Sequence, residues 1–178
     1  MGMTQPITTT CCIAGGGPAG MMLGFLLARA GIDVTVLEKH GDFLRDFRGD
    51  TIHPSTLQLM HELGLLGDFL KLPHDEITEL SAQVGPDVVT IADFRHLPTV
   101  CKFLALMPQW DFLDFIADRA RELPNFHLLL NTEATGLLEE GEQIAGVRTA
   151  GGAIRAKLTI AADGRHSVLR DAAKLTVT

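Results

Sequence analysis

Apolar runs and glycine-rich breaks alternate at the start of the chain. Small and β-branched residues predict a strand over Thr8–Ala14, and an apolar run predicts a helix over Met21–Ala30 that ends at Gly31. The residues that recur at helical spacing here are Ala19, Leu23, Leu26, Leu27 and Ala30. A second apolar strand follows at Asp33–Leu37. This order of strand, glycine turn, helix and strand predicts a βαβ unit of a parallel sheet.

The middle of the chain predicts two helices with a segment of short strands between them. One helix is expected between Pro54 and Gly64, and another between Asp111 and Arg121. Residues 77–106 alternate between apolar and polar side chains and contain Gly-Pro and Leu-Pro turn signals. We therefore expect a piece of an antiparallel sheet inserted into a nucleotide-binding domain.

The C-terminal third predicts strands in two arrangements. Phe126–Leu130 predicts a third parallel strand. Glycine turns then separate three runs that predict a β-meander, namely Thr132–Glu139, Gln143–Ala150 and Ala153–Lys157. A further apolar strand, Leu158–Ala162, ends at Asp163-Gly164 and leads into a helix that begins at Val168. The meander disfavours an NAD-dependent dehydrogenase, because a plain NAD-type Rossmann domain would continue with another helix.

The turn between the first strand and the first helix reads Gly15-x-Gly17-x-x-Gly20. In such a turn the three glycines make the tight bend, admit a pyrophosphate to the backbone and let the helix pack on the strand, while the helix N-terminus attracts phosphates. Glu38 ends the next strand 18 residues after Gly20, where a carboxylate can accept hydrogen bonds from a ribose. The pattern predicts a dinucleotide site whose candidate residues are Gly15, Gly16, Gly17, Pro18, Ala19, Gly20, Glu38 and Lys39.

Composition and charge narrow the class of protein. The 178 residues, of which 46% are hydrophobic, suffice for one well-cored domain. A net charge of −7 argues against nucleic acid as a partner. The uncharged run Cys11–Ala28 is broken by glycines and has no positive start, so we expect neither a signal peptide nor a membrane segment. Three cysteines without paired spacing indicate a reducing cytoplasm.

The sequence does not contain the motifs of a metalloenzyme or of a serine hydrolase. The seven histidines are scattered and form no metal-binding motif. Ser167 does not lie in a Gly-x-Ser-x-Gly motif, which forms the nucleophile elbow of many hydrolases. The sequence therefore predicts no metal site and no catalytic residue.

Five segments, in this order, resemble the FAD-dependent aromatic hydroxylases of the para-hydroxybenzoate hydroxylase type, the group A flavoprotein monooxygenases. They read GGGPAG, LEKH, DFRGDTIHPSTLQLMHELGL, MPQWDFLDFIADRA and ADGRHSVLR, and they extend from about Cys11 to Asp171. The resemblance implies an α/β fold: a Rossmann-like FAD-binding domain with a parallel sheet, a β-meander and part of an inserted antiparallel substrate-domain sheet.

The resemblance also implies a role for each matching residue. The glycine turn would hold the FAD pyrophosphate, and the acid after the second strand would hold the adenosine ribose. Arg48, which by itself would be read as a solvated surface arginine, would contact the phosphate and ribityl region, and Gln109 would contact the same part. Ala134 would meet the adenine through its backbone. Asp163 and Gly164 would contact the flavin from a strand end where open α/β sheets bind ligands.

By the same resemblance the chain divides into three parts. Residues 1–76 and 108–178 would form the FAD-binding domain, and residues 77–107 would be a partial antiparallel substrate-domain segment. The family's later Gly-Asp motif has no counterpart before Thr178. We therefore expect the C-terminal half of the family fold to be missing and the chain to be an N-terminal fragment that carries cofactor-binding residues.

The implied activity is that of a flavin-dependent monooxygenase. FAD reduced by NADPH or NADH would activate O₂ and hydroxylate an aromatic or similar small molecule, and a homodimer is compatible with this activity. The alternatives are a related FAD-dependent reductase, dehydrogenase or halogenase, and a nucleotide-binding module without turnover. Bound flavin separates FAD from NAD binding, and NADPH oxidation stimulated by phenolic compounds separates a hydroxylase from a dehydrogenase.

Overall fold

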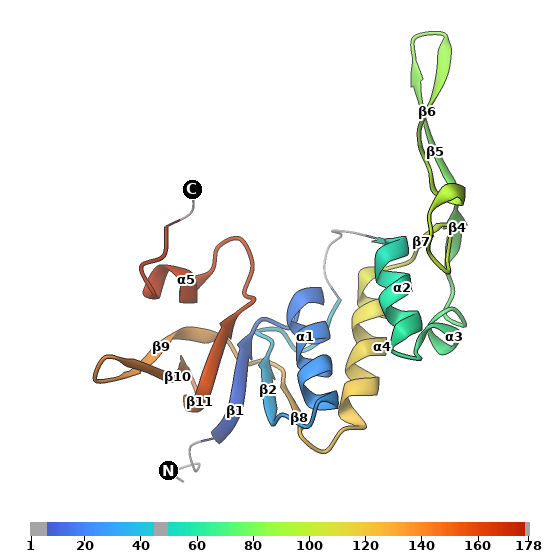
Figure 1. Ribbon diagram of the computed structural model, residues 1–178. Helices are drawn as coiled ribbons and strands as arrows, with labels where there is room; N and C mark the ends of the chain where they lie inside the picture. The colour runs from blue at the N-terminus through green and yellow to red at the C-terminus, as the bar shows by residue number, and fades with distance from the viewer. Residues whose placement is uncertain (1–6, 45–49, 177–178) are drawn as a thin grey trace. The chain divides into compact units, whose positions relative to one another are not determined.

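The computed structural model describes residues 7–44 and 50–176, and the chain divides into two compact units (Figure 1). The first unit consists of Met1–Phe43 and Ile116–Thr178, and the second of Leu44–Phe115. No helix within the described residues has the length and apolar character needed to cross a membrane.

A six-stranded sheet forms the centre of the first unit, with the strand order β8-β2-β1-β11-β10-β9. Its strands are β1 (Ile7–Ala14), β2 (Val34–Leu37), β8 (Phe126–Leu129), β9 (Ala134–Glu140), β10 (Gln143–Thr149) and β11 (Gly152–Ala161). The strands β8, β2, β1 and β11 run parallel to one another, whereas β10 is antiparallel to both β9 and β11. The parallel sheet, its third strand and the β-meander predicted from the sequence are confirmed.

One strand of this sheet is longer than the sequence predicted. The runs Ala153–Lys157 and Leu158–Ala162 were expected to be separate strands, and this expectation is wrong, because β11 is continuous. Its first part pairs with β10, up to the partners Gly146 and Arg155, and it pairs with β1 from Ile154 to Ala161. A change of partner, without a break in the chain, therefore joins the meander to the parallel sheet.

The helix α1 (Pro18–Arg29) packs against β1, β2 and β8 through a face of mostly small residues. The buried residues are Gly20, Met21, Gly24, Phe25 and Ala28. A Cβ at Gly24 would lie only 2.6 Å from Val36 Cγ2 and 3.0 Å from Phe126 Cε2. The helix therefore approaches the sheet through its glycines. The larger apolar side chains noted at helical spacing, Leu23, Leu26 and Leu27, are only half-buried.

The second unit contains two small antiparallel sheets and short helices. The elements are β3 (Thr51–Ile52), α2 (Pro54–Glu62), α3 (Leu66–Phe69), β4 (Asp75–Ile77), β5 (Glu79–Val84), β6 (Asp87–Asp93), the 3₁₀ helix η1 (Phe94–His96) and β7 (Leu104–Leu106). The strands pair as β3-β7-β4 and as the hairpin β5-β6, so the antiparallel pairing expected from the sequence is confirmed. α4 (Gln109–Arg121) begins in this unit, where Phe112 and Phe115 pack edge-on against Phe69.

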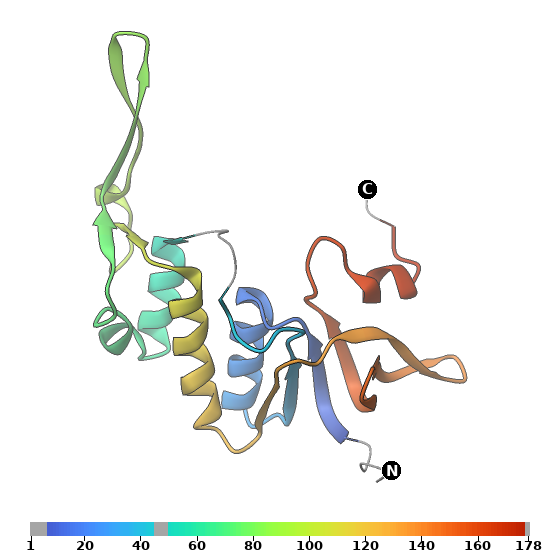
Figure 2. The ribbon, with the colours of Figure 1, turned by 180° about the vertical axis from the view of Figure 1, so that it is seen from behind.

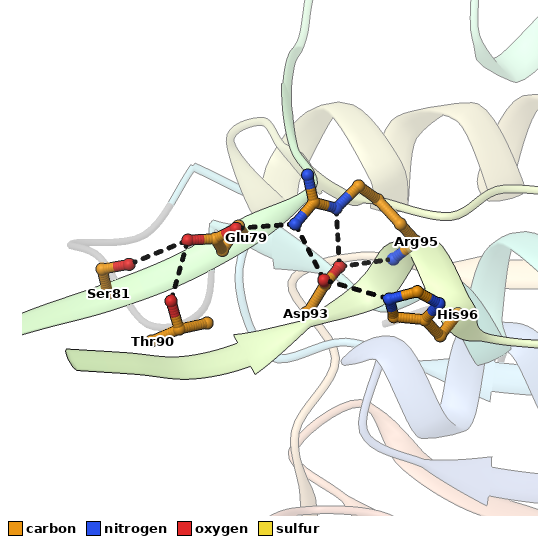
Figure 3. Close-up of polar contacts among 6 residues, drawn as sticks. All are labelled: Glu79, Ser81, Thr90, Asp93, Arg95 and His96. Carbon is orange, nitrogen blue, oxygen red and sulfur yellow. Dashed lines mark hydrogen bonds and ion pairs between the residues drawn. The ribbon is translucent and has the colours of Figure 1, made fainter.

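The hairpin β5-β6 is a narrow ribbon, and no other described helix or strand of the second unit lies along its outer part (Figures 1 and 2). A cluster of charged side chains at its base joins the two strands to η1 (Figure 3). The Arg95 guanidinium donates to Asp93 at 2.8 Å and to Glu79 at 2.8 Å. Glu79 also accepts from the hydroxyls of Ser81 and Thr90 on the two strands. Polar contacts at the protein surface therefore fix the base of the hairpin.

Candidate dinucleotide site

The glycine turn connects the carboxyl end of β1 to α1, and its first residue has no room for a side chain. Gly15 has a φ of +109°, and a Cβ there would lie 2.3 Å from the backbone oxygen of Ala162. Its N–H donates to the carbonyl oxygen of Leu37 at 2.8 Å. The turn is therefore packed between the ends of β2 and β11, and glycine is required at its first position.

The later part of the turn is open. A Cβ at Gly17 would have no atom outside its immediate chain neighbours within 4 Å, and the φ of −71° is one that any residue can adopt. Gly17 is the N-cap of α1 without a side-chain cap, and the exposed Pro18 and Ala19 form the first turn of the helix. Gly20 is buried, and a Cβ there would lie 1.9 Å from the Gly15 oxygen. The uncapped helix N-terminus beside an open backbone is the geometry that binds phosphate groups.

Glu38 lies at the carboxyl end of β2 and is 8% exposed. One carboxylate oxygen, Oε2, accepts from the Gly16 N–H at 3.1 Å, and the other, Oε1, accepts from the His40 N–H at 3.0 Å. The neighbouring Lys39 is exposed. The structure thus brings the acid predicted for the ribose directly against the glycine turn.

Asp163 follows β11 at the same edge of the sheet as the glycine turn, since its backbone nitrogen would be 2.9 Å from a Cβ at Gly15. Its Oδ2 accepts from the Leu169 N–H at 3.3 Å, whereas its buried Oδ1 has no hydrogen-bond partner among the described residues. Gly164 has a φ of +90°. A buried carboxylate oxygen without a partner is costly, so it points to a donor supplied by a ligand.

A cavity of about 510 Å³ lies beside Asp163 and Gly164 and is lined largely by apolar side chains of β9, β10, β11 and α5 (Val168–Ala172). This volume lies within the range of small-molecule sites, roughly 300–1,000 Å³. Thr159 and Ala161 of β11 also line it, and Thr159 Oγ1 has no hydrogen-bond partner among the described residues. Two of the residues that line this largely apolar cavity therefore each carry a buried polar atom without a hydrogen-bond partner among the described residues.

The remaining candidate residues occupy different surroundings. Ala134 is the first residue of β9 and is 8% exposed, within the apolar core of the first unit. Gln109 is the first residue of α4, not a residue before the helix as expected, and it belongs to the second unit. Arg48 lies outside the described residues. The structure therefore groups the glycine turn, Glu38, Ala134 and the Asp163-Gly164 pair in one unit. The cofactor roles of all these residues, like those of Gln109 and Arg48, stay predictions.

The sequence analysis did not identify Thr159 as a residue that lines the cavity, and it did not identify Ser167 as a helix cap. Counting back from Asp163 in steps of two along the strand gives Ala161 and Thr159, so strand periodicity could have found the threonine. Ser167, considered only as a nucleophile, is the N-cap of α5 and accepts from the Arg170 N–H at 3.0 Å. Its place between Asp163 and a helix start is the signal of a cap.

The cysteines are unsuited to chemistry at this site. Cys11, Cys12 and Cys101 are buried free thiols. Burial raises the pKa of the Cys12 thiol to about 12, with a smaller contribution from Cys11, and burial also raises the pKa of Cys11 and of Cys101. Since the thiolate is the reactive form, these side chains act as apolar core residues.

The chain belongs to the FAD binding domain family, whose model matches residues 8–178. The family resemblance read from the sequence is therefore confirmed. 6-Methylpretetramide 4-monooxygenase of Streptomyces rimosus is 34% identical over 166 residues, which cover 91% of this chain and 40% of that protein. An uncharacterized aromatic compound monooxygenase of Bacillus subtilis (strain 168) is 30% identical over 92% of this chain and 32% of its own length.

A solved structure shares the fold. The crystal structure of p-nitrophenol 4-monooxygenase from Pseudomonas putida DLL-E4 matches with a TM-score of 0.80 at 26% identity, over 97% of this chain and 45% of that chain. The chain thus spans less than half the length of each of these similar proteins.

The described residues fit FAD. The open backbone at Gly17 leaves space at a helix N-terminus for a pyrophosphate. The unsatisfied Asp163 Oδ1 offers an acceptor for a group that carries hydroxyls, as the ribityl chain of FAD does. Both features lie at the carboxyl edge of the parallel strands, where open α/β sheets bind ligands.

Proposed function

We propose that the protein is a flavin-dependent monooxygenase that hydroxylates an aromatic small molecule with O₂ and NADPH or NADH. The observation that carries the FAD part is the uncapped start of α1 at Gly17, which follows a turn that contacts the Glu38 carboxylate at Gly16 and the backbone of Asp163 at Gly15. The names of the similar proteins support the monooxygenase part, since they include an aromatic compound monooxygenase and a p-nitrophenol 4-monooxygenase. The alternatives are a related FAD-dependent reductase, dehydrogenase or halogenase, and a nucleotide-binding module without turnover.

In this proposal the chain binds and orients FAD, and the bound flavin supplies the redox and oxygen chemistry. Backbone N–H groups at the start of α1 bind the pyrophosphate, where the helix dipole favours negative charge. Glu38 accepts from a ribose hydroxyl, and Asp163 Oδ1 accepts from a hydroxyl of the ribityl chain. Ala134 and the apolar residues around it exclude water from the edge of the adenine pocket.

The proposal includes a cytoplasmic location, which rests on the cysteines. All three are buried free thiols, as expected in a reducing compartment. A homodimer stays a prediction.

Two measurements test the function. The purified protein should carry, or take up, FAD with the visible absorbance of a bound flavin. With the complete product of the gene, phenolic compounds should stimulate NADPH or NADH oxidation and should be recovered with one added hydroxyl group. Flavin binding without stimulated oxidation, across a panel of phenols, would leave a binding module as the better account.

A further inference from the structure

The carboxylate of Glu38 is already used by the protein itself. Its Oε2 accepts from the Gly16 N–H at 3.1 Å in a buried hydrogen bond, and its Oε1 accepts from the His40 N–H at 3.0 Å. With 8% of its surface exposed, this side chain is the one charged member of the four buried polar or charged residues among those that the structure describes. A buried charge is tolerated only where hydrogen bonds compensate its desolvation, and these two contacts contribute to that compensation and help to hold the side chain in place.

The backbone on which Glu38 sits is tied to a second connection of the sheet. The Glu38 N–H donates to Leu129 O at 2.9 Å, and the Thr132 N–H donates to Glu38 O at 2.8 Å. The Asn131 N–H donates to His40 O at 2.9 Å, from a residue whose φ is +52°. These bonds continue the pairing of β2 and β8 beyond the strand ends, so Glu38 projects from a fixed support.

The glycine turn meets this support through Gly16. A Cβ at Gly16 would lie 2.8 Å from Glu38 Cβ and 3.0 Å from Glu38 Oε2, so the turn backbone rests directly on the glutamate side chain. Gly15, Gly16 and Gly17 are consecutive. Glycine loses more conformational freedom on ordering than any other residue type, so an unrestrained run of glycines is costly to order. The contact with Glu38 removes that freedom at the middle residue.

We propose that Glu38 is a positioning residue for the glycine turn, which it holds in the binding conformation before the cofactor arrives. This role rests on the proposed FAD site and adds to the ribose contact, because the same carboxylate has remaining acceptor capacity. Glu38 therefore raises FAD affinity in two ways, of which one operates in the protein without FAD. The contact through Gly16 requires an acceptor at the right distance, whereas it does not require a negative charge.

Three substitutions separate distance from charge. E38Q keeps the length and an acceptor oxygen but removes the charge, E38D keeps the charge but shortens the side chain by one methylene, and E38A removes both. E139A, at an exposed glutamate of β9, serves as the matched control. Far-UV circular dichroism establishes that each variant is folded.

The first readout is amide hydrogen exchange at residues 15–17 in the protein without FAD. In E38D and E38A the Gly16 amide should exchange about tenfold or more faster, as expected from the loss of a hydrogen bond to a charged group. E38Q should exchange more slowly than E38D and E38A, because its amide oxygen can still accept from the Gly16 N–H, while its NH₂ group then faces the His40 N–H and that hydrogen bond is lost. E139A should leave this exchange unchanged.

The second readout is the FAD dissociation constant, measured by quenching of flavin fluorescence. E38D and E38A should bind about tenfold or more weakly, and E38Q should recover most of that loss. Unchanged exchange at Gly16 in E38D and E38A would overturn the proposal. The proposal would also be overturned if E38Q kept the turn protected from exchange but bound FAD as weakly as E38A does. If the unsubstituted protein fails to bind FAD, the proposed function fails, while the exchange measurement still decides whether Glu38 orders the turn.

Discussion

The sheet of the first unit and the hairpin of the second differ in where they place their apolar residues. Ile13, Val34 and Val36 in β1 and β2 are 0% exposed. In the hairpin, Val88 is 73% exposed and Ile91 is 68% exposed. Both segments are rich in β-branched residues and read as strands in the sequence, so composition alone does not distinguish them.

The difference shows that two kinds of force order the two regions. The parallel strands are covered by α1 and by the core cluster around Val147 and Leu169, so burial of apolar surface holds them together. The hairpin has only two strands, an arrangement of marginal stability by itself, and its base is fixed by the exposed cluster around Arg95. The residues of a ligand site must be held in position within a fraction of an ångström, so we expect such a site on the buried sheet and not on the hairpin.

The largest effect on stability is expected when a buried isoleucine of the sheet is replaced by alanine, and the same replacement in the hairpin serves as its control. Ile13→Ala should lower the free energy of unfolding by about 2–5 kcal/mol, because it removes a fully buried side chain and leaves a cavity. Ile91→Ala should change it by less than about 0.5 kcal/mol, because that side chain is mostly exposed. Urea unfolding followed by circular dichroism measures both. Equal losses in the two variants would mean that the hairpin is as well buried as the sheet.

Gly15→Ala tests how tightly the glycine turn is packed into the sheet. A methyl group 2.3 Å from the Ala162 oxygen forces the backbone to move, so the free energy of unfolding should fall by about 1–3 kcal/mol. The measurement is again urea unfolding, and it does not involve FAD. A variant as stable as the original protein would show that the turn has freedom that its contacts do not suggest.

Gly17→Ala is the matched control with the opposite pattern of effects. A methyl group there meets open space and ordinary backbone angles, so stability should change by less than about 0.5 kcal/mol. FAD binding should weaken by about tenfold or more, since the methyl group would occupy space at the phosphate position, and tenfold corresponds to about 1.4 kcal/mol. Fluorescence titration with FAD measures the effect, and full affinity in this variant would place the phosphates elsewhere.

The smallest effect is expected at the base of the hairpin. Hydrogen bonds from Arg95 hold the pKa of Asp93 well below its usual range. Because the folded-state pKa is lowered, this stabilisation is present above the ordinary aspartate pKa of about 3.9 and is lost only as the pH falls through the lower folded-state value. The cluster should therefore persist at neutral and mildly acidic pH.

Arg95→Ala should return the pKa of Asp93 toward its usual range, which carboxyl carbon chemical shifts measured against pH would report. The unfolding of the first unit should stay the same, because the cluster is exposed and lies within the second unit. An unchanged Asp93 titration in this variant would show that another group lowers its pKa.

Much of the sheet could be predicted from the sequence, because the relevant signals are local. The glycine turn, the acid after β2 and the Asp-Gly pair after β11 each stand beside an apolar run that marks a strand. The contact between Glu38 and Gly16 was not predictable, since it joins residues 22 positions apart through a side chain. Likewise, the buried face of α1 follows from the close approach at Gly24, and glycine carries no signal in a hydrophobic pattern.

The continuity of β11 could have been predicted from the sequence. Apolar and polar residues alternate without a break from Ile154 to Ile160, through Lys157 and Leu158, as they do in a single strand. In the structure the strand changes partners before this point, from β10 and β1 to β1 alone, and the backbone continues. The break expected after Lys157 therefore came from treating the meander and the strand before Asp163 as separate elements, which the pattern itself does not require.

The most direct test of the central claim is a titration of the 178-residue chain with FAD, followed by flavin fluorescence and absorbance. The account predicts saturable binding of one FAD per chain, weakened in Gly17→Ala and unaffected in Ile91→Ala. A chain that is folded by circular dichroism but binds no FAD, or binds it equally well with Gly17 substituted, would contradict the assignment of the glycine turn as the cofactor site.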